Sequence, residues 1–481
     1  MLDYDSLFIG GQWVPPSSAH RITAIDASTE EAIGSVPEAQ ELDVDAAVLA
    51  ARRAFVDPSG WARWSPADRA TAMERLADIL ERRAEDVVQC VSAQNGMPVA
   101  VARQLEGVFP VVLLRYYASL ARETDLDDIR PGVFGGNILV RREPLGVVAA
   151  IVPWNFPQTL AAFKYAPALA AGCTLVIKPS PETVLDSYVF AEAVAEAGLP
   201  PGVINVVPGG RDVGAYLVAH PGVDKISFTC STAAGRAIGE VCGKLLKPVT
   251  LELGGKLAAI VLDDADLDLQ TVGQELFTAT LLNNGQTCFL GTRVLAPRTR
   301  YAEMVDLFTA FAESLTVGNS LDEATRIGPL ATAGQQDRVE RYIAKGRGDG
   351  ARITCGGGRP AGMDKGWFVE PTVFADVDNH HTIAQQEIFG PVLSIIPYSD
   401  EAEAIRIAND SDYGLGGTVW TSDPDRGLAV AAQIQTGTIG VNTYLPDPAA
   451  PFGGVKASGL GRELGPEGLA NYQQLKSIYL R

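Results

Sequence analysis

Short apolar runs alternate with amphipathic segments through the middle of the chain, and this alternation predicts a parallel sheet. Between the apolar runs, hydrophobic residues recur three to four positions apart, which is typical of helices. Strands and helices that alternate at this spacing form βαβ units, so we predict a doubly wound α/β domain whose ligands bind beyond the carboxyl ends of the strands. The predicted strands are 146–152, 173–178, 203–207, 224–228 and 249–253, and the predicted helices are 158–171, 183–197, 211–219 and 232–246.

A second alternation follows and predicts a second α/β domain. Its predicted elements are strand 258–262, a helix to about 283, strand 291–296, helix 300–316, strand 391–398, helix 401–409, strand 416–420, helix 425–434 and strand 437–442.

The first part of the chain predicts helices, and two segments predict an arm. Helices are expected over 41–55, 65–93 and 97–121, the second one opening with an N-capping serine and a proline in its first turn. Residues 135–145 alternate as an extended hairpin would, and the end of the chain, SIYL, is extended in character. We expect such a free edge to pair with another subunit.

The charge balance excludes two classes of partner. Lys plus Arg is 39 and Asp plus Glu is 58, so the formal net charge is 39 − 58 = −19. An acidic chain repels nucleic acid and anionic membranes, so we expect neither as a partner. The start of the chain has no basic and apolar leader, and the longest apolar runs, such as 146–152, are too short to span a bilayer. We therefore expect a cytoplasmic protein.

The cysteines and histidines do not predict a metal site. Six cysteines are scattered without a C-x-x-C pair, and the four histidines show no ligand spacing with them. In a reducing compartment the same scatter argues against disulfides. One thiol stands out: Cys288 lies in the polar turn NNGQTC, between a helical run and a strand-like run. It is either a buried filler or a nucleophile.

Two further motifs follow predicted strands of the first domain. No G-x-G-x-x-G or G-x-x-x-x-G-K-[ST] loop is present, but FTCST (228–232) offers hydroxyls where a helix begins. Such residues bind phosphate at a helix N-terminus, although serine and threonine are also ordinary N-caps. LELGG (251–255) brings Glu252 to the ligand-binding edge of the sheet, where it is a functional acid or one half of a salt bridge.

Two aromatic motifs can each be interpreted as functional or as purely structural. In PWNFP (153–157), prolines on both sides would fix the amide of Asn155, which could then donate to an oxyanion, or the segment is a packed aromatic turn. In EIFGP (387–391), Glu387 and Phe389 could contact a ribose and a flat ring, or the segment simply begins a strand.

Taken together, these motifs resemble the aldehyde dehydrogenase superfamily, in its NAD(P)-dependent, non-acylating branch. The motifs that carry the resemblance are PWNFP, LELGG, NNGQTC, EIFGP and PFGGVKASGLGRE (451–463), and the similarity runs from GGQWV near the start to the last strand. The resemblance implies an NAD(P)-binding domain of residues 1–121 and 145–253 and a catalytic domain of 254–455. It also implies a bridging element of 122–144 and 456–481, and a homodimer or homotetramer.

The resemblance implies a role for each catalytic residue. Cys288 would attack the aldehyde carbon, and the side chain of Asn155, with the Cys288 backbone N–H, would hold the oxyanion. Glu252 would activate the water that hydrolyses the thioester. Because acylating relatives can lack this glutamate, its presence favours hydrolysis. Lys164 and Glu463 match a pair proposed to relay protons, although a buried Lys–Glu pair can be purely structural.

The resemblance also implies a cofactor site for NAD, with NADP possible. Pro181 stands where NAD-preferring relatives often carry an acid, and Cys230 stands where a glycine is usual, so we expect looser cofactor binding than with glycine. The implied cofactor residues are Ile151, Pro153, Trp154, Lys178, Ser180, Pro181, Phe228, Thr229, Ser231, Leu253, Glu387 and Phe389.

The implied substrate pocket carries no charge, which favours a medium-chain, terpenoid or aromatic aldehyde. Two rival functions are a cofactor-independent thiol esterase and a non-catalytic binding protein on the same fold. The second requires a lost nucleophile or base, and both are present. The implied pocket residues are Phe156, Leu160, Phe163, Leu282, Thr287, Phe289 and Phe452.

Overall fold

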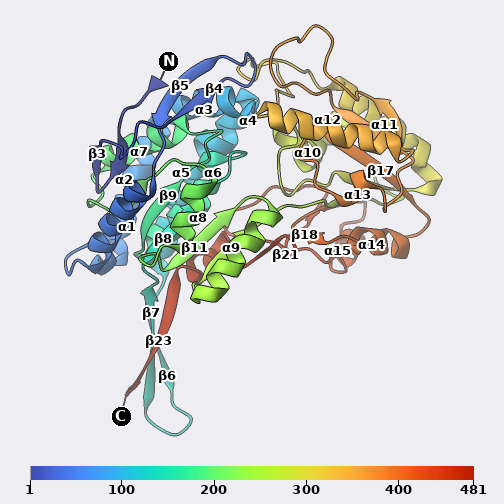
Figure 1. The fold of residues 1–481 in the computed structure, drawn as a ribbon. Coiled ribbons are helices and arrows are strands. Elements are labelled where there is room, and N and C mark those ends of the chain that lie inside the picture. Colours follow the sequence, from blue (N-terminus) through green and yellow to red (C-terminus); the bar gives the residue numbers. More distant parts are fainter. Residues whose placement is uncertain (1, 481) are drawn as a thin grey trace.

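The computed structural model, which describes residues 2–480, contains two α/β bodies side by side and an arm that projects from one of them (Figure 1). The predicted α/β fold class is confirmed. An eight-stranded sheet forms the centre of the first body and a seven-stranded sheet the centre of the second. The C-terminal strand runs along the arm.

The eight-stranded sheet reverses its strand order at a point that explains the position of the site. Five parallel strands lie in the order β12-β11-β8-β9-β10, so the chain moves outward from β8 in one direction and then returns to the other side of β8 with β11. The loops that leave β8 and β11 separate there and open a crevice for a ligand. The strands are β8 (Val147–Ile151), β9 (Thr174–Lys178), β10 (Ile204–Val206), β11 (Lys225–Thr229) and β12 (Val249–Glu252), with antiparallel β22 (Gly459–Leu460), β2 (Leu7–Ile9) and β3 (Gln12–Val14) at the edges.

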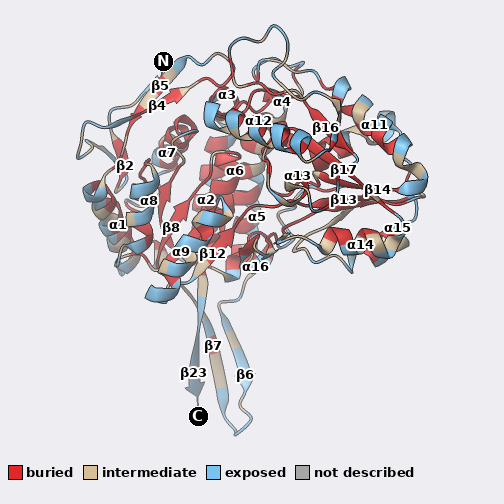
Figure 2. Ribbon diagram, turned by 45° about the vertical axis from the view of Figure 1, so that its right-hand side comes forward, coloured by how far each residue is buried: buried red, intermediate tan, exposed pale blue. Residues whose placement is uncertain are grey.

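Helices cover both faces of this sheet, because successive strand residues point to opposite sides. Apolar residues of α1, α8 and α9 pack on one face and those of α6 and α7 on the other, where α2 and α5 form a further layer over α6 and α7. All 15 residues of α6 are buried, so this helix lies inside the body rather than on its surface (Figure 2). The helices are α1 (Glu41–Val56), α2 (Pro66–Arg82), α3 (Ala84–Asn95), α4 (Val99–Ala102), α5 (Phe109–Glu123), α6 (Pro157–Ala171), α7 (Leu185–Ala197), α8 (Arg211–Ala219), α9 (Thr232–Leu245) and α16 (Gly465–Ala470).

Two long helices of the prediction are interrupted in the structure. The sequence predicts one helix over 65–93, but Arg83 (φ −98°, ψ 9°) separates α2 from α3. It also predicts one helix over 97–121, whereas Arg103–Val108 form a π-helical segment between α4 and α5. In both places the hydrophobic spacing continues across the interruption, so the pattern alone does not reveal it.

The second body contains a largely parallel sheet in the order β15-β16-β17-β14-β13-β19-β20. Its strands are β13 (Ala258–Val261), β14 (Arg293–Pro297), β15 (Arg352–Cys355), β16 (Thr372–Ala375), β17 (Val392–Tyr398), β19 (Thr418–Trp420) and β20 (Gly440–Val441). Its helices are α10 (Leu269–Thr280), α11 (Tyr301–Ser314), α12 (Ala333–Gly348), α13 (Thr382–Gln385), α14 (Glu401–Asn409) and α15 (Pro424–Ala431). Two small sheets complete the chain, one of β1 (Leu2–Asp3), β5 (Ala32–Pro37) and β4 (Arg21–Ile25) and one of β18 (Tyr413–Gly414) and β21 (Val455–Lys456).

The arm is a three-stranded antiparallel sheet of β6 (Asp127–Pro131), β7 (Asn137–Pro144) and β23 (Gln473–Leu480). Residues 459–470, which the sequence assigns to the bridging element, instead pair with β12 through β22 and pack on α6 through α16. No helix within residues 2–480 has both the length and the apolar character needed to cross a membrane. Over the same residues, no group of three His, Cys, Asp or Glu side chains is arranged to hold a metal ion.

Candidate active site

Cys288 follows a left-handed turn that only a few residue types adopt easily. Asn283, Asn284 and Gly285 have φ values of 52°, 59° and 75°. Asparagine and glycine tolerate this region better than other residues. At Gly285 a Cβ atom would lie 2.1 Å from the carbonyl oxygen of Gly390, so no larger residue fits. The NNG sequence thus dictates the turn that delivers the thiol.

The Asn284 side chain fastens this turn to Gly96 of the first body and to residues 328–329 of the second. Its Nδ2 donates to the carbonyl oxygens of Gly96 at 2.8 Å and Pro329 at 2.9 Å, and its Oδ1 accepts the Gly328 N–H at 2.7 Å. All three bonds are buried, where an unpaired polar group is expensive. The turn is therefore rigid before any ligand binds.

Asn155 lies opposite this turn, in the loop that leaves β8. Its backbone carbonyl accepts hydrogen bonds from the side chains of Asn95 at 3.2 Å and Asn283 at 2.9 Å, which tie the loop to the NNG turn. Its own Nδ2 donates to the carbonyl oxygen of Gln286 at 3.0 Å. An amide carries two such hydrogens, so one N–H of Asn155 remains for a ligand.

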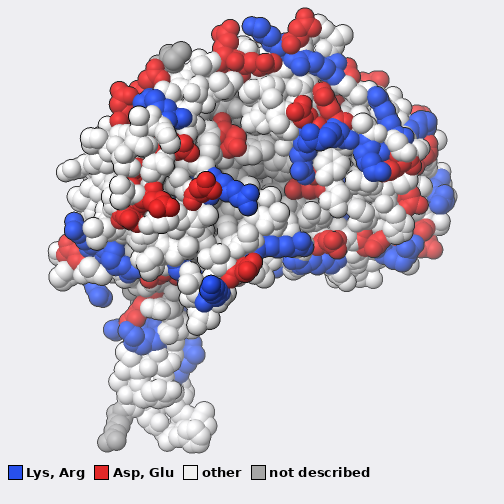
Figure 3. Space-filling view, in the orientation of Figure 1, with Lys and Arg blue, Asp and Glu red and all other residues white. Residues whose placement is uncertain are grey.

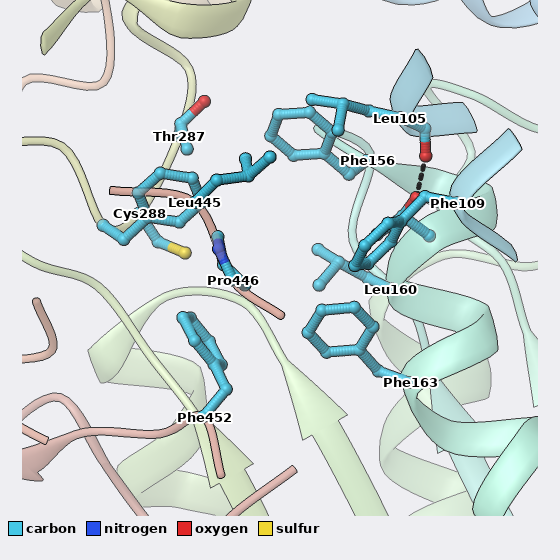
Figure 4. Close-up of a pocket in the computed structure, with 12 residues that line it drawn as sticks. Leu105, Phe109, Phe156, Leu160, Phe163, Thr287, Cys288, Leu445, Pro446 and Phe452 are labelled. Atoms are coloured by element: carbon cyan, nitrogen blue, oxygen red, sulfur yellow. Dashed lines mark hydrogen bonds between the residues drawn. The ribbon is translucent and has the colours of Figure 1, made fainter. Parts of the chain in front are cut away.

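Cys288 separates two cavities and is the one residue that borders both. The first cavity, shown in Figure 4, is apolar and aromatic and has no charged side chain in its wall. We call it the substrate cavity. It is lined by Leu105, Phe109, Phe156, Thr159, Leu160, Phe163, Thr287, Cys288, Phe289, Leu445, Pro446 and Phe452.

The second cavity lies at the carboxyl ends of β8, β11 and β12, where the strand order of the sheet reverses. We call it the cofactor cavity. It is lined by Pro153, Trp154, Asn155, Thr229, Cys230, Ser231, Leu253, Gly254, Cys288, Gln335, Arg338, Glu387 and Phe389.

One residue predicted for the substrate cavity does not line it, and five residues that line it were not predicted. Leu282 is buried in the core and does not line the cavity; its backbone carbonyl accepts the hydroxyl of Thr287 at 3.0 Å. The other predicted residues do line it. The residues that the sequence did not reveal are Leu105, Phe109, Thr159, Leu445 and Pro446.

Most of the predicted cofactor residues meet in the cofactor cavity. Ile151 and Phe228 do not, because they are register partners within the sheet and their side chains are buried in it. Lys178, Ser180 and Pro181 lie outside the wall, in and just after β9. Gln335 and Arg338 are new. They come from α12, for which the sequence offered no motif.

Several features of the cofactor cavity fit a dinucleotide. Ser231 caps α9, whose first N–H groups can hold phosphate oxygens. Glu387 supplies a carboxylate, and its Oε1 accepts the Gly255 N–H at 2.9 Å. A Cβ on Gly254 would lie 2.4 Å from Glu387 Oε2, so a larger residue there would displace the Glu387 carboxylate. The Phe389 ring meets Trp154 edge to face, with the ring centres 5.4 Å apart, and can pack on a flat ring.

A lysine and two carboxylates lie beside this cavity. The Lys178 ammonium donates to the carbonyls of Pro179 at 2.9 Å and Gly209 at 2.5 Å, and burial lowers its pKa to about 8. The carboxylates of Glu182 and Glu38 oppose this effect through their charges. Glu182 also accepts the Ser180 hydroxyl. Acidic side chains thus stand close to the Pro181 position.

Glu252 lies at the end of β12 with both carboxylate oxygens buried and without a hydrogen-bond partner among residues 2–480. Burial raises its pKa well above the usual range, and the charge of Glu463 adds to the rise, while Lys164 opposes it. A carboxylate without donors is a strong proton acceptor. Glu252 therefore has the environment of a base.

Lys164 and Glu463 form the predicted pair. The Lys164 Nζ lies 2.7 Å from Glu463 Oε1, with the two side chains 0% and 1% exposed. Nζ also donates to Thr229 Oγ1 at 2.6 Å, and Ser227 Oγ donates to Glu463 Oε1 at 3.2 Å. The pair thus joins β11, α6 and the segment before α16 in one buried polar cluster.

The Cys288 thiol is protonated in this environment. Burial raises its pKa well above the usual range, and the charges of Glu387 and Glu252 raise it further. No histidine lines either cavity. A proton must therefore leave Cys288 before the sulfur can attack, and Glu252 is a carboxylate close enough to influence that thiol.

Comparison with known proteins gives a consistent result across the chain. The sequence profile of the aldehyde dehydrogenase family matches residues 13–478. The chain is 57% identical over 479 residues to a geranial dehydrogenase of Castellaniella defragrans, an alignment that covers 100% of this chain and 99% of that protein.

Solved structures agree with the sequence comparison. An aldehyde dehydrogenase of Mycobacterium tuberculosis in complex with NAD+ superposes with a TM-score of 0.97 at 48% identity, covering 100% of this chain and 99% of that one. A mutant of aldehyde dehydrogenase C from Pseudomonas syringae, in complex with NAD+ and octanal, gives a TM-score of 0.94 at 39% identity, covering 99% and 96%.

Proposed function

The chain belongs to the aldehyde dehydrogenase family and is an NAD-dependent aldehyde dehydrogenase, and from this premise we propose that it oxidises an apolar aldehyde to the carboxylic acid. The substrate class is medium-chain, terpenoid or aromatic. The observation that carries the proposal is the position of Cys288, whose thiol borders an uncharged aromatic cavity on one side and a dinucleotide-type cavity on the other.

In the first step, Cys288 forms the bond to the aldehyde carbon. Glu252 takes the thiol proton, and the sulfur then attacks the carbonyl carbon to give a thiohemiacetal alkoxide. The free N–H of the Asn155 amide and the Cys288 backbone N–H donate to that oxygen. Because the turn and the loop are both held by buried hydrogen bonds, these donors need little reorganisation.

In the second step, the enzyme hydrolyses the acyl group. A bound NAD+ would supply the acceptor for the hydride that leaves the substrate carbon, and a thioester would then remain on Cys288. Glu252 then takes a proton from a water molecule, the hydroxide attacks the thioester carbon, and the acid leaves as the thiol is restored. Between the two steps Glu252 must give up the thiol proton, and Lys164 and Glu463 would relay it away from Glu252 to solvent, so that the carboxylate is a base again when water enters.

Three observations support an apolar substrate. The substrate cavity has aromatic rings on several sides, among them Phe163 and Phe452, whose centres lie 6.0 Å apart. Its polar side chains are two threonines and the cysteine. The relative at 57% identity is named for geranial, a terpenoid aldehyde, and a solved neighbour holds octanal. An anionic aldehyde would lose its hydration in this cavity without gaining a partner.

We further propose that NAD is preferred to NADP. Gln335, Arg338, Glu387 and Phe389 would hold the nicotinamide half, and the α9 N-terminus at Ser231 the diphosphate. Near Lys178, the carboxylates of Glu38 and Glu182 stand where a 2′-phosphate would meet like charge. Glu38 and Glu182 would thus take over the role of the acidic residue that NAD-preferring relatives often carry at the position of Pro181.

The arm supports a homodimer or homotetramer. Its tip exposes Val133 and Phe134 at 95% and 103% of their full areas, and Tyr479 on β23 is 79% exposed. The tip carries no charged side chain on the face in Figure 3, whereas basic and acidic groups are interspersed over the bodies. Exposed apolar residues on a free sheet edge are stabilised by a second copy. A monomer in light scattering at micromolar concentration would contradict this.

Absorbance of the reduced nicotinamide tests the activity directly. Octanal, geranial, benzaldehyde and succinic semialdehyde are each supplied with NAD and with NADP, beside the Cys288→Ser variant. We expect cofactor reduction with the three apolar aldehydes and NAD, and none with the variant. A preference for the anionic semialdehyde would refute the substrate class. Ester hydrolysis by Cys288 without any cofactor reduction would favour the esterase instead.

A further inference from the structure

One wall of the substrate cavity comes from the π-helical segment 103–108 and the first residue after it. Leu105 and Phe109 project from this wall into the cavity (Figure 4). A π-helical turn changes the direction of side chains and occurs often at functional sites. The Leu105 carbonyl accepts the hydroxyl of Thr159 on α6, a contact drawn in Figure 4. The segment is therefore tied to α6, which lies beside it on the same side of the cavity, away from Cys288 (Figure 4).

The adjoining part of this wall is the first half of α6. Phe156, at the N-cap position, and Leu160 and Phe163 face the cavity from this helix. Phe156 cannot cap the helix, since its side chain has no oxygen, and the first N–H groups of a helix have no partner within it. The helix start is buried, so these groups need an acceptor from elsewhere.

Glu106, in the middle of the π-helical segment, provides that acceptor. Its Oε2 accepts the Gln158 N–H at 2.7 Å and its Oε1 accepts the Thr159 N–H at 3.4 Å. The residue is 2% exposed. The Gln158 side chain in turn donates to Asp186 Oδ2 at 2.6 Å, which fixes the first turn of α6 against α7. One carboxyl group therefore fixes the π-helical segment against the first turn of α6, and with them the cavity wall that lies across from Cys288.

We propose that Glu106 is a positioning residue that fixes the shape of the cavity wall across from Cys288 and thereby the preference for long apolar aldehydes over short ones. The proposal rests on the proposed function for its substrate class. Glu106 does not itself line the cavity, so it acts through Leu105 and Phe109 and through the residues of α6 that do.

The chemistry of the contact predicts which substitutions are tolerated. Burial raises the pKa of Glu106 well above its usual range, and the nearby charge of Asp186 adds to the rise. A glutamine has nearly the same shape and retains one of the two oxygen acceptors, so it is a close substitute in this contact. Glu106→Gln keeps an oxygen acceptor for Gln158, whereas Glu106→Ala leaves the N–H groups unpaired.

Steady-state kinetics with octanal and propanal separate positioning from a general structural role. We expect Glu106→Ala to raise the KM for octanal by a factor at least five times larger than the factor for propanal. The KM for NAD should not change. Glu106→Gln should stay within twofold of the wild type for both aldehydes. Glu123→Ala is the matched control, because this exposed acid lies on α5 and its carboxylate contacts Ser119. If the ratio of the KM for octanal to the KM for propanal is the same in Glu106→Ala as in the wild type, the proposal is wrong.

A binding experiment keeps this proposal separate from the proposed activity. In the Cys288→Ala background no turnover occurs, and calorimetry gives the dissociation constants of octanal and propanal with and without Glu106→Ala. A selective loss of octanal affinity supports the role of Glu106 even if the wild type oxidises neither aldehyde, an outcome that would refute only the activity. Equal losses for both aldehydes would overturn the role of Glu106 even if the enzyme is active.

Discussion

The buried pair of Lys164 and Glu463 allows a prediction whose size follows from the structure. At 2.7 Å and an effective dielectric constant of about 20, the attraction is about 6 kcal/mol, and it offsets the cost of removing both charges from water. Lys164→Met keeps the length of the side chain but leaves Glu463 buried with the Ser227 hydroxyl as a remaining donor. We expect this variant to lose about 3–5 kcal/mol of unfolding free energy.

The double variant Lys164→Met/Glu463→Gln removes both charges and should recover much of that loss. Unfolding in urea, followed by tryptophan fluorescence, gives the free energies of the wild type, the two single variants and the double variant. We expect the double variant to lose less unfolding free energy than the two single variants lose together, by about 2 kcal/mol or more. Additive losses, or a Lys164→Met protein as stable as the wild type, would show that the pair is not coupled.

The same substitution tests the connection with Glu252. The Lys164 charge holds the pKa of Glu252 below the value that burial alone would give, so its removal raises that pKa further. A base works only when it is deprotonated, and a higher pKa therefore moves the acid limb of kcat to higher pH. Single-turnover hydrolysis of the acyl enzyme, measured across pH, should show this shift in Lys164→Met. An unshifted limb would mean that Lys164 does not influence the base.

Three further predictions concern the cofactor side of the thiol. Asn155→Ala should lower kcat by about 100-fold to 1000-fold with little change in the KM for NAD, and a kcat within tenfold of the wild type would exclude Asn155 as oxyanion donor. Cys230→Gly should lower the KM for NAD by about threefold to tenfold, and an equal KM would show that this side chain does not crowd the diphosphate. Burial raises the pKa of Glu387 to about 7, so protonation below that pH should raise the KM for NAD. Glu387→Gln should have a high KM for NAD that does not depend on pH. A wild-type KM for NAD that is constant from pH 6 to 8 would contradict this prediction.

The periodicity of the sequence was sufficient for the α/β fold because each buried strand is short, apolar and followed by a turn. It could not show where helices break. At Arg83 the apolar positions of α2 continue in phase into α3, and the interruption is visible only in the backbone angles. The π-helical segment was hidden for the same reason, and with it the part of the cavity wall that contains Leu105.

The candidate site was predictable where a residue type and its neighbours have few alternative explanations. Cys288 in an Asn-Asn-Gly turn is such a case, since those residues also determine the local backbone. Gln335 and Arg338 are the opposite case. They are ordinary polar residues one turn apart on α12, and only the folded position of that helix beside residues 387–389, whose carbonyl oxygens accept from both side chains, brings them to the cofactor cavity. Leu282 was misassigned because its backbone, and not its side chain, contacts Thr287.

Since Cys288 is the one residue that the two cavities share, their walls can change independently during evolution. A substitution in the aromatic wall alters which aldehydes fit without disturbing a side chain that borders the dinucleotide. New substrate ranges are therefore accessible by single steps that leave the redox partner untouched. Inhibitors of the two cavities should differ in the same way. A compound that fills the aromatic cavity competes with the aldehyde, while its affinity is unaffected by the concentration of NAD.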